Sequence, residues 1–288
     1  MPLPTRSCAL SIASVDSVTL ARAVEKFHAL SFGSKFEMVR RMKSSLRELV
    51  VGVATLAALI ALSARADTPV TISSDQGLAF DYDRENYQRL LTDIIQRGHS
   101  AVSAELGWTL ERPLKINVYT PVHYEKQFGS VAAATRGAHY FQGAIYVNGG
   151  SRLNDGFAGT MVHELTHAFL DYHGTGMRLP TWLNEGLAER LAWKRKGLDE
   201  LAPNQVMSIQ YARRQGKLTP LPVWVNTMDY LQFYAAALFV EKKVGKDKLL
   251  SVVRRTLQGE PFERVLDQEI RWTVTDLERE FAAWVDRL

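Results

Sequence analysis

The 288-residue sequence predicts an α+β fold in which a small mixed sheet is followed by a helical part. Segments with strand patterns lie before residue 150, whereas later segments space their apolar residues as helices do. The regular alternation of strand and helix that a parallel α/β repeat requires does not occur. With 46% hydrophobic and 23% charged residues, the chain has the composition of a globular protein with a substantial core.

The first 66 residues differ from the rest of the chain. Residues 38–66 contain a basic segment, an apolar run at residues 49–62 and an Ala-Arg-Ala sequence of the kind cut by signal peptidase. This pattern predicts a signal peptide that ends at Ala66. Residues 1–37 are interpreted as a non-native N-terminal extension, with translation starting at Met38. The alternative is an uncleaved membrane anchor, although the apolar run is shorter than the about 20 residues that span a bilayer.

Both interpretations place residues 67–288, as a single domain, outside the cytoplasm, and a cleaved signal places it in the periplasm. This part carries 26 basic and 27 acidic side chains, so the excess positive charge belongs to the N-terminal segment. A nucleic-acid partner therefore has no electrostatic basis. The only cysteine, Cys8, lies in the same segment, so neither a disulfide nor thiol chemistry is expected after residue 66.

Four local patterns follow in order up to residue 150. Residues 77–82 resemble a strand, and residues 85–107 have the apolar spacing of a helix that stops at a glycine. Residues 114–120 alternate apolar and polar side chains, as a half-buried strand does. Residues 143–148 form a second short strand candidate bounded by glycines.

The next segment contains the motif His163-Glu164-x-x-His167. On a helix, this spacing places both imidazoles on one face, where both can reach one Zn²⁺ at about 2.0–2.1 Å. Glu164 is rotated about 100° around the axis and can face a metal-bound water without being a ligand. The alternative is a solvated face with two surface histidines. Apolar residues on most sides of the helix argue against it: Met161, Val162, Leu165, Ala168, Phe169 and Leu170.

A second helix is predicted to begin just past Pro180, after a glycine-containing break at residues 173–176. Because the chain can double back there, Glu185, one turn into the new helix, would arrive as a third ligand. Two histidines, one glutamate and a water form the open geometry of catalytic zinc, whereas structural zinc sites have four protein ligands.

Two further acids could orient a ligating histidine. Glu189 lies on the same helical face as Glu185 and could accept the Nδ1–H of a ligand, with an ordinary exposed acid as an equal alternative. Asp171, one turn after His167, is a weaker candidate for the same role. The remaining histidines of this part of the chain have no partner at ligand spacing and are interpreted as ordinary residues: His99, His123, His139 and His173.

The segments HELTHAFLDY and PTWLNEGLAE resemble the gluzincin metallopeptidases, the thermolysin and M1 aminopeptidase kind. Over most of residues 75–288 the chain is similar to compact bacterial peptidase MA-like proteins, which share a G-x-I-x-V strand, H-E-x-x-H, P-x-W-L-x-E-G and a later tyrosine-bearing helix. The resemblance implies a zincin-like catalytic domain that binds zinc. It also implies that residues 143–148 are the edge strand along which an extended peptide or protein substrate lies, with a plain sheet edge as the alternative.

The resemblance further implies a tyrosine that stabilises the oxyanion from the helix expected at residues 229–245. Tyr230 and Tyr234 lie one turn apart there, and Tyr230 fits better by its distance to Gly245. The alternative is a pair of core aromatic residues. Two more helices are expected at residues 246–259 and 274–288.

These expectations combine in an extracytoplasmic zinc-dependent peptidase. The metal would activate water and polarise the scissile carbonyl, and Glu164 would take a proton from the water and return it to the leaving amine. The alternative is a catalytically retired, zinc-binding scaffold or assembly protein of the envelope, which would need the ligands but not Glu164. An adhesion module would need none of these residues.

Overall fold

The computed structural model describes residues 70–75, 84–218, 220–221 and 230–288. The chain divides into two units, Met1–Ala66 and Asp67–Leu288, and all described residues belong to the second. The expected signal peptide, the extension before it and the strand expected at residues 77–82 lie outside the described residues. None of the described helices is long and apolar enough to cross a membrane.

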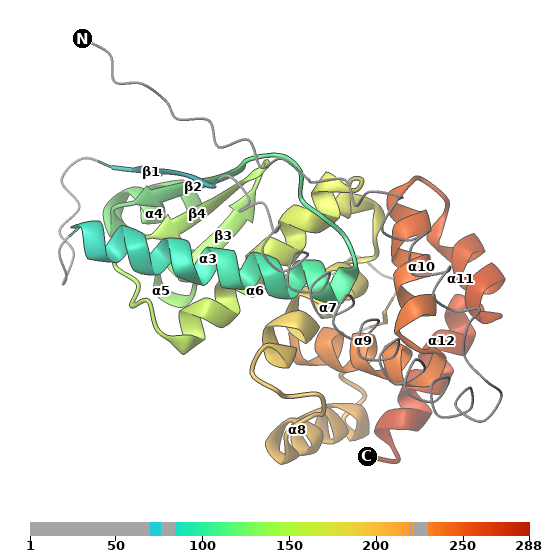
Figure 1. Ribbon diagram of the computed structural model, residues 1–288. Coiled ribbons are helices and arrows are strands. Elements are labelled where there is room, and N and C mark those ends of the chain that lie inside the picture. Colours follow the sequence, from blue (N-terminus) through green and yellow to red (C-terminus); the bar gives the residue numbers. More distant parts are fainter. Residues whose placement is uncertain (1–69, 76–83, 219, 222–229) are drawn as a thin grey trace, which may run out of the picture. The chain divides into compact units, whose positions relative to one another are not determined.

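In the described part of the chain, four strands form one small mixed sheet (Figure 1). They are β1 (Val70–Ser74), β2 (Leu114–Tyr119), β3 (Ala138–Phe141) and β4 (Ala144–Asn148), in the order β1-β2-β4-β3. β1 and β4 run parallel to β2, and β3 runs antiparallel to β4. A tight turn with positive φ at Gln142 and Gly143 joins β3 to β4, which suits a two-residue hairpin loop.

The strand order corrects one expectation from the sequence. The segment at residues 143–148 is a strand, but β4 lies inside the sheet between β2 and β3 and cannot offer a free edge. The edge strand is β3, which carried no clear sequence signal because it has only four residues. β1, the opposite edge strand, was also missed.

The described chain is mostly helical, and most of its helices follow the sheet, as expected for an α+β protein. The described α-helices are α3 (Arg84–Leu106), α4 (Pro121–Phe128), α5 (Ser130–Thr135), α6 (Asp155–Tyr172), α7 (Thr181–Lys194), α8 (Pro203–Arg214), α9 (Tyr230–Val244), α10 (Lys246–Leu257), α11 (Phe262–Ile270) and α12 (Val274–Val285). A short 3₁₀ helix, η2 (Gly176–Arg178), connects α6 to α7.

α6 is the central helix of the fold. It begins where the Asn154 side chain accepts a hydrogen bond from the Phe157 N–H, a typical N-cap. It packs against β3 and β4 on one side and against α3 and α7 on others. Its apolar residues from Met161 to Leu170 are buried, which excludes the solvated helix face considered from the sequence.

α7 is fixed by a close approach to α9. A Cβ atom at Gly186 would lie 2.3 Å from the carbonyl oxygen of Phe233, so only glycine permits this packing. Because Gly186 directly follows Glu185, the same contact holds the start of α7 against the molecule and sets where the Glu185 side chain emerges. The close packing of α7 on α9 therefore explains why the residue after the expected third ligand is a glycine.

Candidate metal centre

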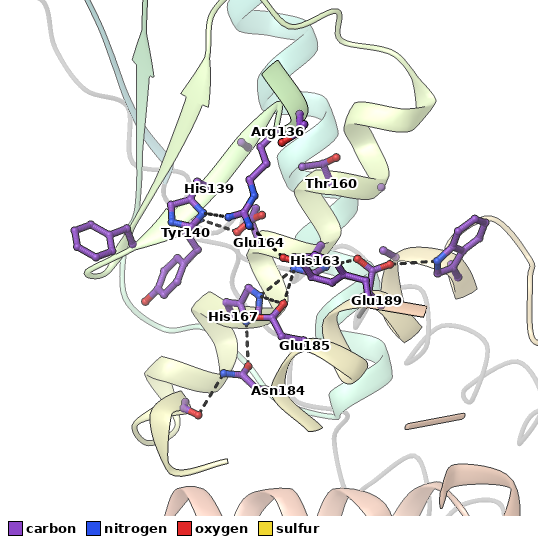
Figure 2. Close-up of a pocket in the computed structure, with 18 of the residues that line it drawn as sticks. Arg136, His139, Tyr140, Thr160, His163, Glu164, His167, Asn184, Glu185 and Glu189 are labelled. Carbon is purple, nitrogen blue, oxygen red and sulfur yellow. Dashed lines mark hydrogen bonds and ion pairs between the residues drawn. The ribbon is translucent and has the colours of Figure 1, made fainter. Parts of the chain in front are cut away.

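Three side chains from α6 and α7 converge on one point. Figure 2 shows His163, His167 and Glu185 pointing toward one another. The two Nε2 atoms lie 3.1 Å apart, and Glu185 Oε2 lies 3.3 Å from His163 Nε2 and 3.6 Å from His167 Nε2. Ligands at about 2.0–2.1 Å from a tetrahedral zinc ion are separated by about 3.3–3.4 Å. The three atoms therefore have the separation that one such ion requires.

The Glu185 carboxylate also has the character of a ligand. Its Oε2 atom is buried and forms no hydrogen bond with any described residue. The two histidine Nε2 atoms face this oxygen at 3.3 and 3.6 Å, and a cation bound between the three atoms would satisfy it. Burial by itself raises the pKa of Glu185. The two neighbouring histidines lower the pKa by more than burial raises it, so the pKa of Glu185 is well below its usual range.

His163 shows the complementary effect. Burial lowers the pKa of His163, but the carboxylates of Glu185, Glu189 and Glu164 together raise it to about 10. A metal ion would compete with a proton for this imidazole, because only the neutral ring can coordinate it.

The outward nitrogen of each histidine has its own partner. Glu189 Oε1 lies 3.1 Å from His163 Nδ1, and Trp193 Nε1 donates to the other Glu189 oxygen at 3.2 Å. Asn184 Oδ1 lies 3.0 Å from His167 Nδ1. These partners direct both Nε2 atoms to the common point, as carboxylates and amides behind metal ligands do. Glu189 was one of two equal alternatives from the sequence, whereas Asn184 was missed although it directly precedes Glu185.

Asp171 has a different position from the one considered from the sequence. Its Oδ2 accepts a hydrogen bond from the Tyr140 hydroxyl, and its Oδ1 accepts one from the Gly176 N–H, both at 2.9 Å. Asn184 Nδ2 donates to the Gly176 carbonyl at 3.3 Å. Asp171 therefore reaches His167 only through Gly176 and Asn184, and it ties β3 to the connection between α6 and α7.

Glu164 lies beside the three converging side chains and is not one of them. It is 7% exposed, and its Oε2 accepts a hydrogen bond of 2.7 Å from the Tyr140 backbone N–H. This N–H points away from β4, so the free edge of β3 faces α6. The carboxylate is thus held between the edge strand and the two histidines.

Of the two candidate tyrosines, only Tyr230 lies at this site. Its ring centroid is 6.0 Å from that of His163, and its hydroxyl accepts a hydrogen bond from Arg136 Nη2 at 3.3 Å. Burial and the Glu185 carboxylate raise the pKa of Tyr230 to about 12, so the hydroxyl is neutral. Tyr234 is buried elsewhere, where its hydroxyl donates to the Glu200 carbonyl and its ring stacks on Trp193.

A cleft of about 820 Å³ opens over these groups. One wall is β3 with the residues before it, and the other is formed by α6, α7 and the first residue of α9. Arg136, His139 and Tyr140 line the β3 wall and were not expected there, because their spacing gives no sequence signal. His139 is not among the converging donors, and it contacts Arg136.

Among the described histidines, three more are not part of the cleft lining. His99 contacts the Phe169 ring, His123 pairs with Asp75, and His173 lies 3.0 Å from the Thr109 carbonyl oxygen. Comparison of the chain with models of known protein families and with curated proteins found no match. The geometry of the cleft is therefore the basis for assigning a function.

Proposed function

We propose that this protein is an extracytoplasmic zinc-dependent peptidase of the gluzincin type, with a zincin-like catalytic domain. His163, His167 and Glu185 would hold the metal, and Glu164 would be the general base. One observation carries the proposal. Three nitrogen and oxygen donors at tetrahedral spacing lie in an open cleft, next to a buried carboxylate that is not one of them.

The donor set fits zinc, because two imidazoles and one carboxylate leave a coordination position open. A bound zinc ion supplies Lewis acidity toward water and toward the scissile carbonyl. Glu164 takes a proton from the attacking water and delivers it to the leaving amine. The Tyr140 N–H keeps the Glu164 carboxylate in place between the edge strand and the histidines.

In this proposal, Tyr230 stabilises the negative charge that develops on the carbonyl oxygen. A guanidinium group can only donate hydrogen bonds, so the Tyr230 oxygen is the acceptor in its bond with Arg136. The hydroxyl proton is then free to be donated to the oxyanion. At the free edge of β3 the Tyr140 N–H is taken by Glu164, and the other outward backbone groups are left for an extended peptide, a role that the resemblance assigned to residues 143–148.

The alternative function is a zinc-binding scaffold or assembly protein of the envelope that has lost catalysis. Such a protein would need the three ligands but neither a buried base nor an open cleft beside them. The position of Glu164 and the size of the cleft favour the peptidase.

Glu164→Gln distinguishes the two functions. Its amide oxygen can still accept the Tyr140 N–H, and none of the three donors is changed, so zinc content and thermal stability should be unaltered. Peptide hydrolysis should fall by about 10²–10⁴-fold because the base is lost. The measurements are zinc content by mass spectrometry and kcat/KM on a peptide library. If this variant keeps zinc and biological function while His163→Ala abolishes both, the metal is structural and the peptidase proposal is wrong.

A further inference from the structure

Arg136 is a charged residue of the cleft that the mechanism uses only as a partner of Tyr230. It follows α5 and lies two positions before β3, where it is half-buried. Its Nη1 lies 3.1 Å from His139 Nδ1 (Figure 2), and its Nη2 donates to the Tyr230 hydroxyl oxygen. Neither of these partners is a carboxylate. These bonds use only part of the five N–H donors of a guanidinium group.

No carboxylate in the described part of the chain forms an ion pair with Arg136. Arg190, which is more deeply buried, shows the usual arrangement, with Glu241 and Asp199 at 3.2 and 3.1 Å. A half-buried guanidinium without a carboxylate partner has lost hydration without gaining an opposite charge. A carboxylate from a ligand would supply that charge and could accept two parallel N–H bonds.

The carboxylates that line the cleft already have partners of their own. Glu185 lies between the two histidines, Glu189 contacts His163 and Trp193, and Glu164 accepts the Tyr140 N–H. Asp171 is occupied by the Tyr140 hydroxyl and the Gly176 N–H. The missing opposite charge for Arg136 is therefore expected to come from the molecule that enters the cleft.

The direction of β3 indicates which part of that molecule. A peptide added to the free edge in the antiparallel sense, which is the more stable pairing, runs from the Phe141 end of β3 toward the Ala138 end. Glu164 contacts the strand at Tyr140, and Arg136 lies beyond Ala138. Arg136 is thus on the side of residues that follow the scissile bond.

We propose that Arg136 binds a substrate carboxylate one or two residues after the scissile bond. This carboxylate is either an acidic side chain or the free C-terminus of a short peptide. The inference rests on the proposed peptidase function and adds a substrate class to it, namely peptides with a negative charge on the C-terminal side of the cleaved bond.

The test uses peptides of one parent sequence that the full-chain protein cleaves. One pair has Glu or Gln at the first position after the scissile bond, and a second pair has Glu or Gln at the second position. The peptides of a third pair end at the second position, one with a free carboxylate and one with an amide. Because hydrogen bonds to charged groups are strong, we expect kcat/KM in at least one pair to be about 10–100-fold higher for the peptide with the carboxylate than for its neutral partner. A preference in the third pair alone identifies the C-terminus as the group bound, and a preference in the first two identifies a side chain.

Arg136→Gln should lower kcat/KM for the carboxylate member more than for the neutral member, so the ratio should approach one. Arg136→Lys, which keeps the charge but not the paired donors, should give an intermediate ratio. Lys196→Gln is the matched control, because it removes a positive charge that lies over Trp193 on the opposite wall, and it should preserve the ratio. Zinc content and thermal melting of each variant verify that it is folded.

Three outcomes would overturn the inference. Cleavage of all peptides with ratios near one would refute the carboxylate site and leave the peptidase intact. An equal fall in the ratio for Lys196→Gln would assign the preference to the general charge of the cleft. Failure of the zinc-loaded wild type to cleave any peptide would refute the proposed function itself and the inference with it.

Discussion

At the scale of single residues, the candidate centre depends on the side chains that contact the Nδ1 atoms of its two histidines. Asn184, Glu185 and Glu189 all belong to α7, so one helix provides the third donor and the partners of both histidines. Asn184 and Glu189 fix the two imidazole rings by their Nδ1 atoms. Loss of a donor and loss of a partner should therefore have different consequences for metal binding.

Glu185→Ala removes one of three protein donors, so zinc should be largely lost during purification. Glu189→Ala and Asn184→Ala leave all three donors in place and should weaken zinc binding by about 10–100-fold through misorientation of one ring. A competition titration with a chelating dye measures these affinities. Full zinc occupancy in Glu185→Ala would show that the third ligand is another group.

Tyr230→Phe should lower kcat by up to about 10²–10³-fold without loss of zinc, as expected for removal of one oxyanion donor. Tyr234→Phe is the matched control, because this hydroxyl bonds to the Glu200 carbonyl outside the cleft. It should change stability more than activity. Steady-state kinetics and zinc analysis of both variants test this role. Equal activity of Tyr230→Phe and the wild type would exclude Tyr230 from catalysis.

At the scale of secondary-structure elements, short contacts hold α7 and β3 in place around the cleft. α7 packs on α9 through Gly186, and it is linked to α3 and α10 by a group of charges around Glu105. β3 is attached to the connection after α6 through Tyr140, Asp171 and Gly176. A shift of either element would move side chains that must converge.

Gly186→Ala should lower the free energy of unfolding by about 3 kcal/mol, at the upper end for an overpacked interface, since the new methyl group would meet the Phe233 carbonyl at 2.3 Å. Gly159→Ala on α6 is the control, because its Cβ would meet only the Lys196 side chain, with Cε at 3.6 Å and Nζ at 3.9 Å. Alanine is also favoured there by helix propensity, by up to about 1 kcal/mol. Urea denaturation measures both, and similar stabilities would disprove the close approach of α7 to α9.

Glu105 on α3 gives the fold a pH-dependent contribution. Burial raises the pKa of Glu105, but hydrogen bonds from Lys194 on α7 and Lys246 on α10 lower it below the usual 4.5. A lowered pKa in the folded state stabilises the protein above pH 4.5, and this stability is lost as pH falls through the lowered value.

Glu105→Gln should therefore reduce the free energy of unfolding by about 1 kcal/mol at pH 7, a small effect because the charges are partly exposed. The difference from the wild type should shrink as the pH falls below 4.5. Urea denaturation at several pH values measures it. A difference that does not change with pH would mean that packing, and not charge, is responsible.

At the scale of the whole molecule, the candidate centre draws on segments from Arg136 to Tyr230, all within the unit Asp67–Leu288. The segment before this unit is proposed to direct it across a membrane. Protein recovered from the cell envelope should then have the intact mass of residues 67–288, as determined by mass spectrometry. A product that keeps residues 49–62 and fractionates with membranes would contradict a cleaved signal.

The sequence by itself determined the α+β class and the two helices that carry His163, His167 and Glu185. These features are local. A helix places residues four apart on one face, and a short break at residues 173–176 before Pro180 lets the next helix return to it. Because each step depends on neighbours in the chain, periodicity and glycine and proline positions were sufficient.

Only the tertiary structure decided which strand has a free edge and which polar side chains complete the cleft. β3 and β4 are both short, and β4 lies inside the sheet because it also pairs with β2, a strand distant in sequence, and no local pattern encodes this pairing. The same holds for Arg136, which meets Tyr230 across 94 positions of the chain. The choice between Tyr230 and Tyr234 was likewise made by packing, because both lie on the same side of one helix and only the position of α9 against α7 brings the first into the cleft.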